Sequence, residues 1–418
     1  MKPVFALVDC NNFFVSCELV FQPGLREKPV VVLSNNDGCI ISRSPAAKTL
    51  GIKMGAPAYP YQSLFQRHQV TLFSANYTLY GDLSLRVMNT LRTLAPALEV
   101  YSIDEAFLDL SGRQATELEC YGKKIRETVL RWTGIPVSVG IGATKTLAKA
   151  GSELAKQEEG VFVLYEDNSE KLKELKIEEV WGIGPAYASF LNRQGIRTVG
   201  DYLQTDDVWI KKHLSVLGLR IKQELLGRAC LPLELLHPLQ KSICTSRSFG
   251  SPQSAPASLE EAVGTFTTRC AEKLRADHCC ADRLTVFLHP HPFRPLSQGQ
   301  FPQGTVHLPV ATNSSFELVR EALKILKNIY LPGIRYRKAG VVLSGIVEEK
   351  EIQTTLFDPV NREKERTIMV AMDQINQNFG REVVKIAALG TGGSWKWKQE
   401  RRSPCYTTSW DQLMTIRV

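Results

Sequence analysis

The sequence predicts an α+β protein with more than one domain, and it predicts a ferredoxin-like sheet for the first of them. The chain has 418 residues, of which 44% are hydrophobic and 22% charged, enough for several globular cores. Apolar runs of strand length alternate with helical periodicities in the N-terminal part. An acidic step, Asp104-Glu105, lies between two strand-like runs, where carboxylates are costly unless positive charge is close.

Hydrophobic spacing predicts the elements of the first domain. Strand-like runs occupy 4–9, 30–33, the two sides of the acidic step, and 135–141. Helical spacing of apolar residues spans 83–94 and 118–129, and a third helix is predicted to begin near Thr144. Residues 34–80 are rich in Asn, Ser, Gly, Pro and Tyr, which is typical of a small, loop-laden insertion. The order strand, helix, strand pair, helix, strand is that of a ferredoxin-like domain.

Two glycine-rich turns mark residues 166–240, which are otherwise predicted to be helical with short loops. Gly182 and Gly184 lie in the turn G-I-G-P, and Gly195 and Gly200 lie in the next turn. Glycines let a backbone approach a phosphate closely, and N–H groups at helix starts can donate to it. The pair of turns therefore indicates a helix-hairpin-helix that contacts a nucleic-acid backbone, although ordinary turns use the same residues.

A second α+β unit, of order βαββαβ, is predicted for residues 241–347. Its strand-like runs lie at 242–249, 284–288, 305–308 and 339–343, and its helical stretches lie around 272–274 and over 316–330. Beyond residue 348 the pattern weakens, and an acidic linker leads into a tail with one periodic stretch near 368–375. We expect this tail to become ordered only on a partner.

The net charge of +8 is unevenly distributed, because residues 241–418 alone carry +7. This asymmetry predicts that the part with the carboxylates holds cations and that the basic part, 241–418, binds a polyanion. A basic surface without such a partner would give the same charge distribution. The sequence contains neither an apolar run of transmembrane length nor a signal peptide, so no membrane association is expected. The ten cysteines form no C-x-x-C pair, which favours reduced thiols in a cytoplasmic protein.

Three carboxylates carry the strongest functional signal. Asp9 closes an apolar run, and Asp104 and Glu105 stand at the head of the predicted hairpin. A bound divalent cation would remove both the burial cost and the mutual repulsion of such acids. Two hard cations about 3.5–4 Å apart, held by carboxylates, are the usual apparatus of in-line phosphoryl transfer. The sequence therefore predicts a site for metal-assisted phosphoryl transfer.

Four segments together resemble the Y-family of DNA polymerases, the lesion-bypass enzymes. They are D-C-N-N-F-F at 9–14, S-I-D-E-A-F at 102–107, V-G-I-G-A-T-K-T-L-A-K at 139–149 and G-I-G-P at 182–185. Within this family the chain is similar to the UmuC branch, the catalytic subunits of bacterial DNA polymerase V, in V-L-S-N-N-D-G-C and R-S-P-C-Y-T-T. The resemblance implies an error-prone, DNA-directed DNA polymerase that acts in an SOS-type response to DNA damage.

The resemblance also implies a right-hand polymerase architecture. Residues 1–165 would form the palm, with small fingers inserted at about 25–80. Residues 166–240 would form the thumb and residues 241–347 the little finger. Residues 348–418 would be a linker with a clamp-binding peptide, followed by the C-terminal tail.

In such an enzyme two Mg²⁺ ions occupy each site, with Mn²⁺ as a substitute. The resemblance assigns Asp9 and Asp104 as bridging ligands, Glu105 to the ion near the primer, and the backbone carbonyl of Cys10 as a further ligand. It assigns Phe14 as the steric gate, whose ring fills the space that a ribose 2′-hydroxyl would need. On a strand, the neighbouring aromatic residue would point the other way.

Further residues match positions at which the family contacts the incoming nucleotide: Phe13, Ser42, Lys48 and Lys156. Many members have an aromatic hydroxyl at the position of Pro45 and an arginine at that of Lys48, so this chain departs from the family pattern there. Lys145 and Lys149 lie one helical turn apart and share a face, which would meet DNA phosphates or solvent.

The implied substrates are primer-template DNA and a dNTP, with Arg247 and Arg337 as DNA contacts of the little finger. Gln353, Leu356 and Phe357 fit the Q-x-x-L-F peptide that docks on the bacterial sliding clamp. The UmuC branch further implies a processed UmuD dimer and a RecA filament as partners, and a nucleoid-associated location.

Two other functions share some of these features. A non-catalytic DNA-binding accessory protein could have the same fold, but it would not need the three acids. A nucleotide cyclase uses a similar sheet and paired carboxylates, but it would need neither the glycine-rich turns nor the clamp peptide.

Overall fold

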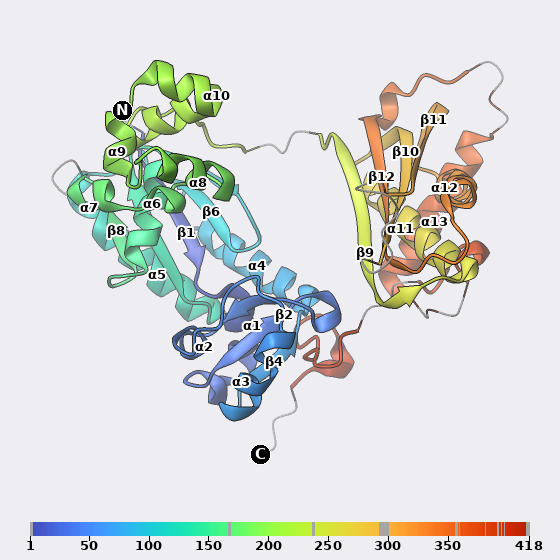
Figure 1. Ribbon diagram of the computed structural model, residues 1–418, viewed down its shortest axis with the longest axis horizontal. Coiled ribbons are helices and arrows are strands. Elements are labelled where there is room, and N and C mark those ends of the chain that lie inside the picture. Colours follow the sequence, from blue (N-terminus) through green and yellow to red (C-terminus); the bar gives the residue numbers. More distant parts are fainter. Residues whose placement is uncertain are drawn as a thin grey trace. The chain divides into compact units, whose positions relative to one another are not determined.

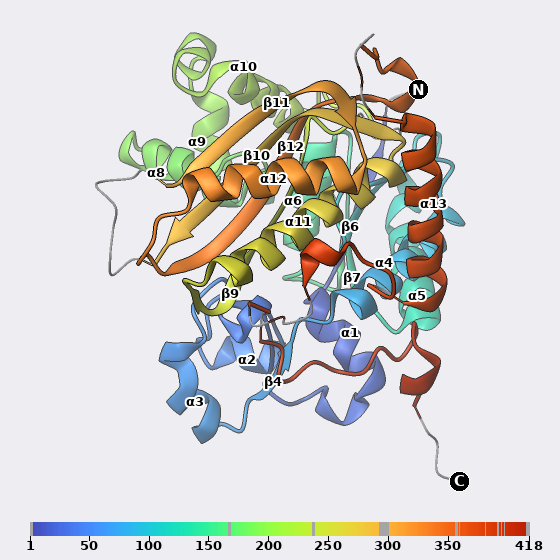
Figure 2. The ribbon, with the colours of Figure 1, turned by 90° about the vertical axis from the view of Figure 1, so that its right-hand side faces the viewer.

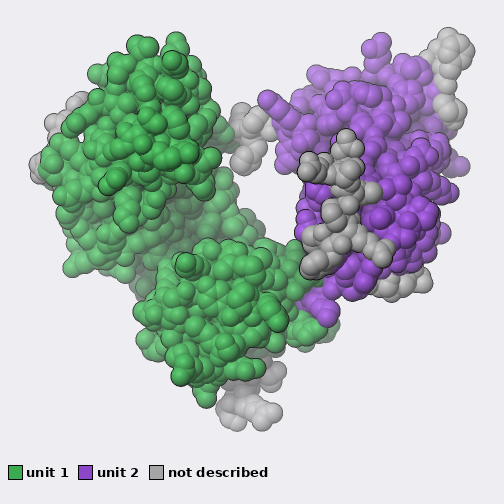
Figure 3. Space-filling view, in the orientation of Figure 1, with its two compact units in different colours: residues 1–237, 400–418 green, residues 238–399 purple. Residues whose placement is uncertain are grey.

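The chain divides into two compact units (Figure 3): residues 1–237 with 400–418 form unit 1, and residues 238–399 form unit 2. This computed structural model describes residues 3–165, 169–235, 239–291, 301–355, 358, 360–380, 382–390, 393, 395–396 and 398–414. Within these ranges, no helix has both the length and the apolar character needed to cross a membrane.

Unit 1 contains a five-stranded sheet in the order β5-β6-β1-β7-β8 (Figure 1). The strands are β1 (Phe5–Cys10), β5 (Leu98–Val100), β6 (Glu105–Asp109), β7 (Val137–Gly142) and β8 (Val161–Val163). The first four strands pair antiparallel, and β8 adds to β7 in parallel. Helices α1 (Phe13–Phe21), α4 (Tyr77–Arg92) and α5 (Leu118–Thr133) share one core with the sheet, while α6 (Lys145–Ala155) packs against β7. The predicted ferredoxin-like sheet is confirmed.

A left-handed residue and a helix follow closely after the strand that carries Asp9. Asn12 adopts a left-handed backbone conformation with φ 48°, and α1 begins at the next residue. Phe13 and Phe14 therefore lie in the first turn of a helix, so placing them at the exit of a strand was wrong. Successive helical residues are about 100° apart, so both rings can lie near the pocket described below.

The insertion between α1 and α4 has its own three-stranded sheet, in the order β3-β2-β4. Its elements are β2 (Val30–Leu33), β3 (Ile40–Arg43), α2 (Pro45–Thr49), α3 (Gln62–Arg67) and β4 (Thr71–Ser74). A separate small core forms around Val31 and Leu33, so the insertion is more regular than its loop-like composition indicates.

Four helices continue unit 1: α7 (Ser169–Glu174), α8 (Pro185–Arg193), α9 (Val199–Gln204) and α10 (Asp207–Leu225). They enclose a core around Leu191 and Tyr202. The Tyr202 hydroxyl donates to the Gly218 carbonyl over 3.0 Å, which satisfies the buried phenol. The helical character predicted for this region is confirmed.

Unit 2 has the predicted βαββαβ order (Figure 2). Its strands are β9 (Ser242–Gln253), β10 (Cys279–Pro290), β11 (Gln303–Thr312) and β12 (Tyr336–Glu348), in the sheet order β11-β10-β12-β9. Helices α11 (Pro256–Ala276) and α12 (Ser315–Ile329) pack side by side on this sheet and share its core.

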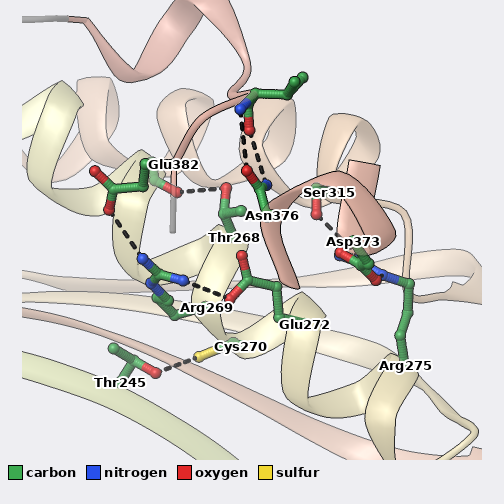
Figure 4. A network of polar contacts seen from close by, with 12 residues as sticks. Thr245, Thr268, Arg269, Cys270, Glu272, Arg275, Ser315, Asp373, Asn376 and Glu382 are labelled. Carbon is green, nitrogen blue, oxygen red and sulfur yellow. Dashed lines mark hydrogen bonds and ion pairs between the residues drawn. The ribbon is translucent and has the colours of Figure 1, made fainter. Parts of the chain in front are cut away.

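The chain beyond β12 is folded where it is described, so the expectation that the tail orders only on a partner was wrong for these residues. Helix α13 (Arg362–Phe379) is fastened to α11 by the Arg275–Asp373 ion pair of 2.6 Å (Figure 4). Trp395 is buried against Phe266, with ring centroids 5.4 Å apart. Large apolar side chains and ion pairs with earlier elements stabilise this part of the chain, whose sequence has little helical periodicity of its own.

The closest packing in unit 1 lies between β7 and α6. A Cβ added to Gly140 would stand 2.0 Å from the Ser152 backbone nitrogen and 2.2 Å from the Ala148 carbonyl oxygen. On the helix side, a Cβ added to Gly151 would stand 3.3 Å from the Gly140 Cα. Backbone therefore lies on backbone here, and this contact sets the distance of α6 from the sheet.

We expect Gly140→Ala to destabilise the protein by about 3 kcal/mol or more, because the new methyl group meets backbone atoms that cannot rotate away. The measurement is the free energy of unfolding in denaturant. Gly81→Ala is the matched control, since nothing lies within 4 Å of its added Cβ. This exposed helical position should gain about 0.5–1 kcal/mol. Equal stability of the two variants would contradict the close contact.

Candidate active site

Three acids from two neighbouring strands meet at one end of the first sheet. Asp9 lies opposite Glu105 in the register of β1 and β6. Asp104 precedes β6, and its backbone carbonyl accepts the Cys10 N–H over 2.9 Å. Side chains alternate along a strand, so Leu7 and Asp9 share a face, as do Glu105 and Phe107. Leu7 and Phe107 pack with Ala148, so this face is the one that α6 covers. The backbone positions of the three predicted acids therefore lie at the same end of the sheet.

Each of the three acids has a polar partner. Lys156, just after α6, places its Nζ 3.0 Å from Asp9 Oδ2. Lys149, on α6, places its Nζ 2.9 Å from Glu105 Oε2. Asp104 Oδ1 accepts the Ser102 hydroxyl over 2.7 Å. Among the described residues, no three Asp, Glu, His or Cys side chains are gathered into a ready-made metal centre. The two lysines supply the positive charge that the acids need.

Asp9 nevertheless remains short of positive charge. The pKa of Asp9 is raised to about 7, chiefly by burial and in smaller part by the neighbouring Glu105 carboxyl, while Lys156 acts in the opposite direction. A carboxyl with a pKa near neutrality, beside two other hard-oxygen donors, would bind a divalent cation without a large cost of deprotonation. The donor set of Asp9, Asp104 and Glu105 therefore fits Mg²⁺ or Mn²⁺ chemically.

Sequence reasoning misplaced the lysines of α6. Lys145 is buried and pairs with the buried Glu99 over 2.7 Å, and its neighbour Lys149 pairs with Glu105. The shared face of this helix therefore points at the sheet, and the expectation that it meets solvent or DNA phosphates was wrong. Glu99 also accepts the Glu234 N–H over 2.8 Å, so the buried charges have several partners.

A pocket of about 240 Å³ opens beside Asp9. All four predicted nucleotide-binding residues line this pocket, whereas the predicted metal ligand Glu105 does not. The lining residues are Asp9, Cys10, Asn12, Phe13, Phe14, Ile41, Ser42, Arg43, Lys48, Met54, Asp104 and Lys156. The pocket thus combines an acidic end, an aromatic wall and a group of cations.

The aromatic wall is supported from behind. Phe14 stacks on Tyr80 with ring centroids 4.8 Å apart, and Tyr77 meets its ring edge-on at 5.9 Å. Ser42 joins this wall to the insertion, because its hydroxyl donates to the Asn12 carbonyl and accepts the Val15 N–H. These two bonds hold the start of α1, so Ser42 has a structural role in addition to lining the pocket.

Three cations, Arg43, Lys48 and Lys156, also line the pocket. The pKa of Lys48 is lowered, chiefly by burial and then by the positive charges of Arg43 and Lys156. A bound anion would relieve this repulsion. Sequence reasoning missed Arg43, which directly follows Ser42 on β3. The alternation of that strand would have assigned the two residues to opposite faces, and only the pocket lining shows that both contribute.

The other predicted residues lie elsewhere in the two units. In unit 1, Gly184 and Gly195 face open space, whereas an added Cβ at Gly182 or Gly200 would meet Ile221 or Lys173. In unit 2, the positions assigned to DNA or clamp binding are on the surface: Arg247 on β9, Arg337 on β12, and Gln353 beyond β12. Leu356 and Phe357 lie outside the described residues.

Comparison with known proteins places these features in a family. The sequence pattern of the impB/mucB/samB family matches residues 8–153, and that of its C-terminal domain matches residues 240–356. A domain of unknown function, DUF4113, matches residues 366–416. UmuC from Salmonella typhimurium is 39% identical over 422 residues, covering 99% of this chain and 100% of that one. DNA polymerase IV from Moorella thermoacetica is 28% identical over 403 residues, with coverages of 92% and 96%.

A solved Y-family DNA polymerase chimera, Dbh-Dpo4(243-245)-Dbh, has a similar structure with a TM-score of 0.65. The two sequences are 23% identical, and the match covers 82% of this chain and 99% of the chimera. The chain therefore has the fold of a Y-family DNA polymerase, with palm, fingers, thumb and little finger. The chain belongs to the impB/mucB/samB family, as the matches at both ends of the sequence and the full-length similarity to UmuC show.

Proposed function

We propose that the protein extends a DNA primer on a template by adding dNTPs, in the error-prone manner of a lesion-bypass polymerase. The meeting of Asp9, Asp104 and Glu105 at one end of the palm sheet is the observation that carries the proposal. The adjoining pocket offers an aromatic wall and three cations to the same substrate. The full-length similarity to UmuC and to DNA polymerase IV supports this activity.

Asp9, Asp104, Glu105 and the backbone carbonyl of Cys10 would hold two Mg²⁺ ions, with Mn²⁺ as a substitute. When bound, these ions lower the pKa of the primer 3′-hydroxyl and stabilise charge on the transferring phosphate. The protein's own contribution is to bring the three acids to one end of the palm sheet, with Asp9 and Asp104 in the lining of the pocket. The paired lysines, Lys149 and Lys156, limit the repulsion between the acids while the substrate is absent.

Lys156, Lys48 and Arg43 would bind the triphosphate of the incoming nucleotide. Their mutual repulsion already lowers the pKa of Lys48, and a polyanion in the pocket would restore it. Lysine acts on phosphate as a point charge, so this group would attract the triphosphate without a bidentate clamp. Arg43 compensates in part for the absence of an arginine at position 48.

Phe14 would act as the steric gate, and Phe13 would support the nucleotide from the same helical turn. Both line the pocket, and Tyr80 stacks on the gate ring from behind. A ring that cannot retreat excludes a 2′-hydroxyl by contact rather than by hydrogen bonding. Sugar selection would then depend on how firmly the ring is held.

Duplex DNA would be gripped by the thumb (166–240) and the little finger (241–347), while the palm (1–165) carries the fingers inserted at about 25–80. Candidate contacts are Gly182, Gly184, Gly195, Gly200, Arg247 and Arg337. Gly184 at the N-terminus of α8 and Gly195 have the open surroundings that a phosphate contact needs. Such contacts ignore base sequence, so binding should weaken steeply with salt.

The segment 348–418 would connect the polymerase to its partners. Gln353, Leu356 and Phe357 would dock on the sliding clamp, and Gln353 is exposed as this requires. A processed UmuD dimer and a RecA filament are further proposed partners, through the similarity to UmuC. With these partners, the protein would act at the nucleoid in the bacterial cytoplasm during an SOS response.

Replacement of a metal ligand tests the activity itself. Asp104→Asn removes one negative charge without changing the side-chain shape, and it should lower primer extension in Mg²⁺ by about three orders of magnitude or more. Asp109→Asn, at the other end of β6, is the matched control and should retain full extension. DNA binding measured at low salt should be similar for both variants. Normal extension by Asp104→Asn would overturn the proposed function.

Sugar selection tests the gate. Phe14→Ala should raise the kcat/KM for ribonucleotides at least about tenfold relative to that for dNTPs, because the excluded volume is opened. Phe14→Tyr keeps the ring and should keep the discrimination. The measurement is single-nucleotide insertion opposite a fixed template base. If Phe14→Ala discriminates as the unaltered protein does, another residue is the gate.

The pKa of Asp9 predicts how Mg²⁺ binding depends on pH. Burial raises this pKa to about 7, so the carboxyl is protonated at lower pH and must lose its proton to bind a cation. The apparent affinity should therefore fall by up to about tenfold for each pH unit below 7 and level off above it. Calorimetry in buffers of different ionisation enthalpy should detect proton release below pH 7. A pH-independent affinity between pH 5.5 and 8 would contradict the assignment of Asp9 as a ligand.

A further inference from the structure

The chain returns to unit 1 after completing unit 2, and residues 401–406, here termed the returning segment, dock beside β4 and α1 (Figure 2). Ser74 forms a parallel bridge with Arg402, and its N–H donates to the Arg401 carbonyl over 3.0 Å. The returning segment thus continues the fingers sheet beyond its edge strand. It also lies within the matched domain of unknown function.

Ser403 is the buried centre of the returning segment. Its hydroxyl donates to Glu18 Oε1 over 3.0 Å and accepts the Asn76 side-chain amide over 3.1 Å. The same amide donates to the Ser403 carbonyl over 2.9 Å, while Asn76 caps the start of α4 through the Leu79 N–H. One serine therefore joins α1 to the N-terminus of α4, across more than three hundred residues of sequence.

Glu18 depends on this serine because it is fully buried and forms no ion pair among the described residues. Its carboxylate accepts hydrogen bonds from the Tyr80 hydroxyl at 2.6 Å and from the Ser403 hydroxyl, both at Oε1, whereas Oε2 has no partner within the described part of the chain. Burial raises the pKa of Glu18, and both hydroxyls oppose that rise. Loss of the Ser403 hydroxyl would leave the carboxyl with Tyr80 alone.

The connection continues to the pocket through Tyr80. This tyrosine donates to Glu18 and stacks on Phe14 at 4.8 Å, and Glu18 lies one helical turn after Phe14 on α1. At the other end of α1, Tyr406 stacks on Phe21 with centroids 4.6 Å apart and an interplanar angle of 16°. The returning segment thus touches α1 at Glu18 and Phe21, which follow Phe14 on the same face of that helix.

We propose that Ser403 and Tyr406 are positioning residues for Phe14, so that the C-terminal segment helps to set the sugar selectivity of the polymerase. The inference rests on the proposed function, in which Phe14 is the gate. Ser403 fixes the Glu18–Tyr80 pair behind the gate ring, and Tyr406 fixes the far end of the helix that carries it. Neither residue lines the substrate pocket, and both act through α1 and α4.

The test measures kcat/KM for a dNTP and for the corresponding ribonucleotide with the full-length protein, and compares the ratio of the two. Ser403→Ala and Tyr406→Ala should each lower the dNTP preference at least about threefold, the order expected from one lost contact. Tyr406→Phe keeps the stacked ring, and Thr408→Ala removes an exposed hydroxyl nearby. Both controls should keep the ratio. A merely structural defect would lower both kcat/KM values together and leave the ratio unchanged.

A double variant separates this inference from the proposed function. Once Phe14→Ala has removed the gate ring, adding Ser403→Ala should change the ratio no further. If Phe14→Ala lowers the ratio and both single tail variants leave it intact, the positioning role is wrong and the gate remains. If Phe14→Ala itself has no effect, the gate and the positioning role both fail. Should Ser403→Ala not fold, Tyr406→Ala decides the matter, since it truncates only a half-buried ring.

Discussion

The functional end of unit 1 depends on the balance between three crowded carboxylates and two lysines. Asp9 and Glu105 face each other across neighbouring strands. Lys149, on α6, pairs with Glu105, and Lys156, just beyond the C-terminal end of α6, pairs with Asp9. The lysines can reach the acids because Gly140 and Gly151 let the helix lie directly on the sheet. A close contact between the backbones of a strand and a helix thereby sets the electrostatics of the site. The pocket beside Asp9 and its cations adjoin this arrangement.

Much of this organisation could be read from the sequence. The ferredoxin-like sheet, the βαββαβ unit and the meeting of the acids follow from hydrophobic period and from the position of D-E at the head of a hairpin. The two faces of α6 could not be assigned, because Lys145 and Lys149 share a stripe in the sequence and only the glycine contact shows that this stripe faces the sheet. The helix that begins at Phe13 could not be predicted, because it starts at a turn in which Asn12 adopts a left-handed conformation, and such a turn has little sequence signature.

The buried acid in α1 shows why other features escaped prediction. Glu18 follows F-F-V-S-C, and a lone glutamate in an apolar stretch has no local partner that would reveal its environment. Its donors come from α4 and from the C-terminus, so the reason for its burial lies entirely in tertiary structure. The tail was equally difficult, because its stability comes from a few distant contacts and from single residues such as Trp395 rather than from any repeating pattern.

The return of residues 400–418 to unit 1 has a consequence for biosynthesis. A ribosome makes the palm and fingers before it makes the segment that completes their hydrogen bonding. Until residue 403 has been added, Glu18 and Asn76 lack their hydrogen bonds to Ser403, so the fingers are completed only after unit 2 has been made. A transcript cut short before this residue, or a protein cleaved before it, would therefore yield a first unit without these hydrogen bonds.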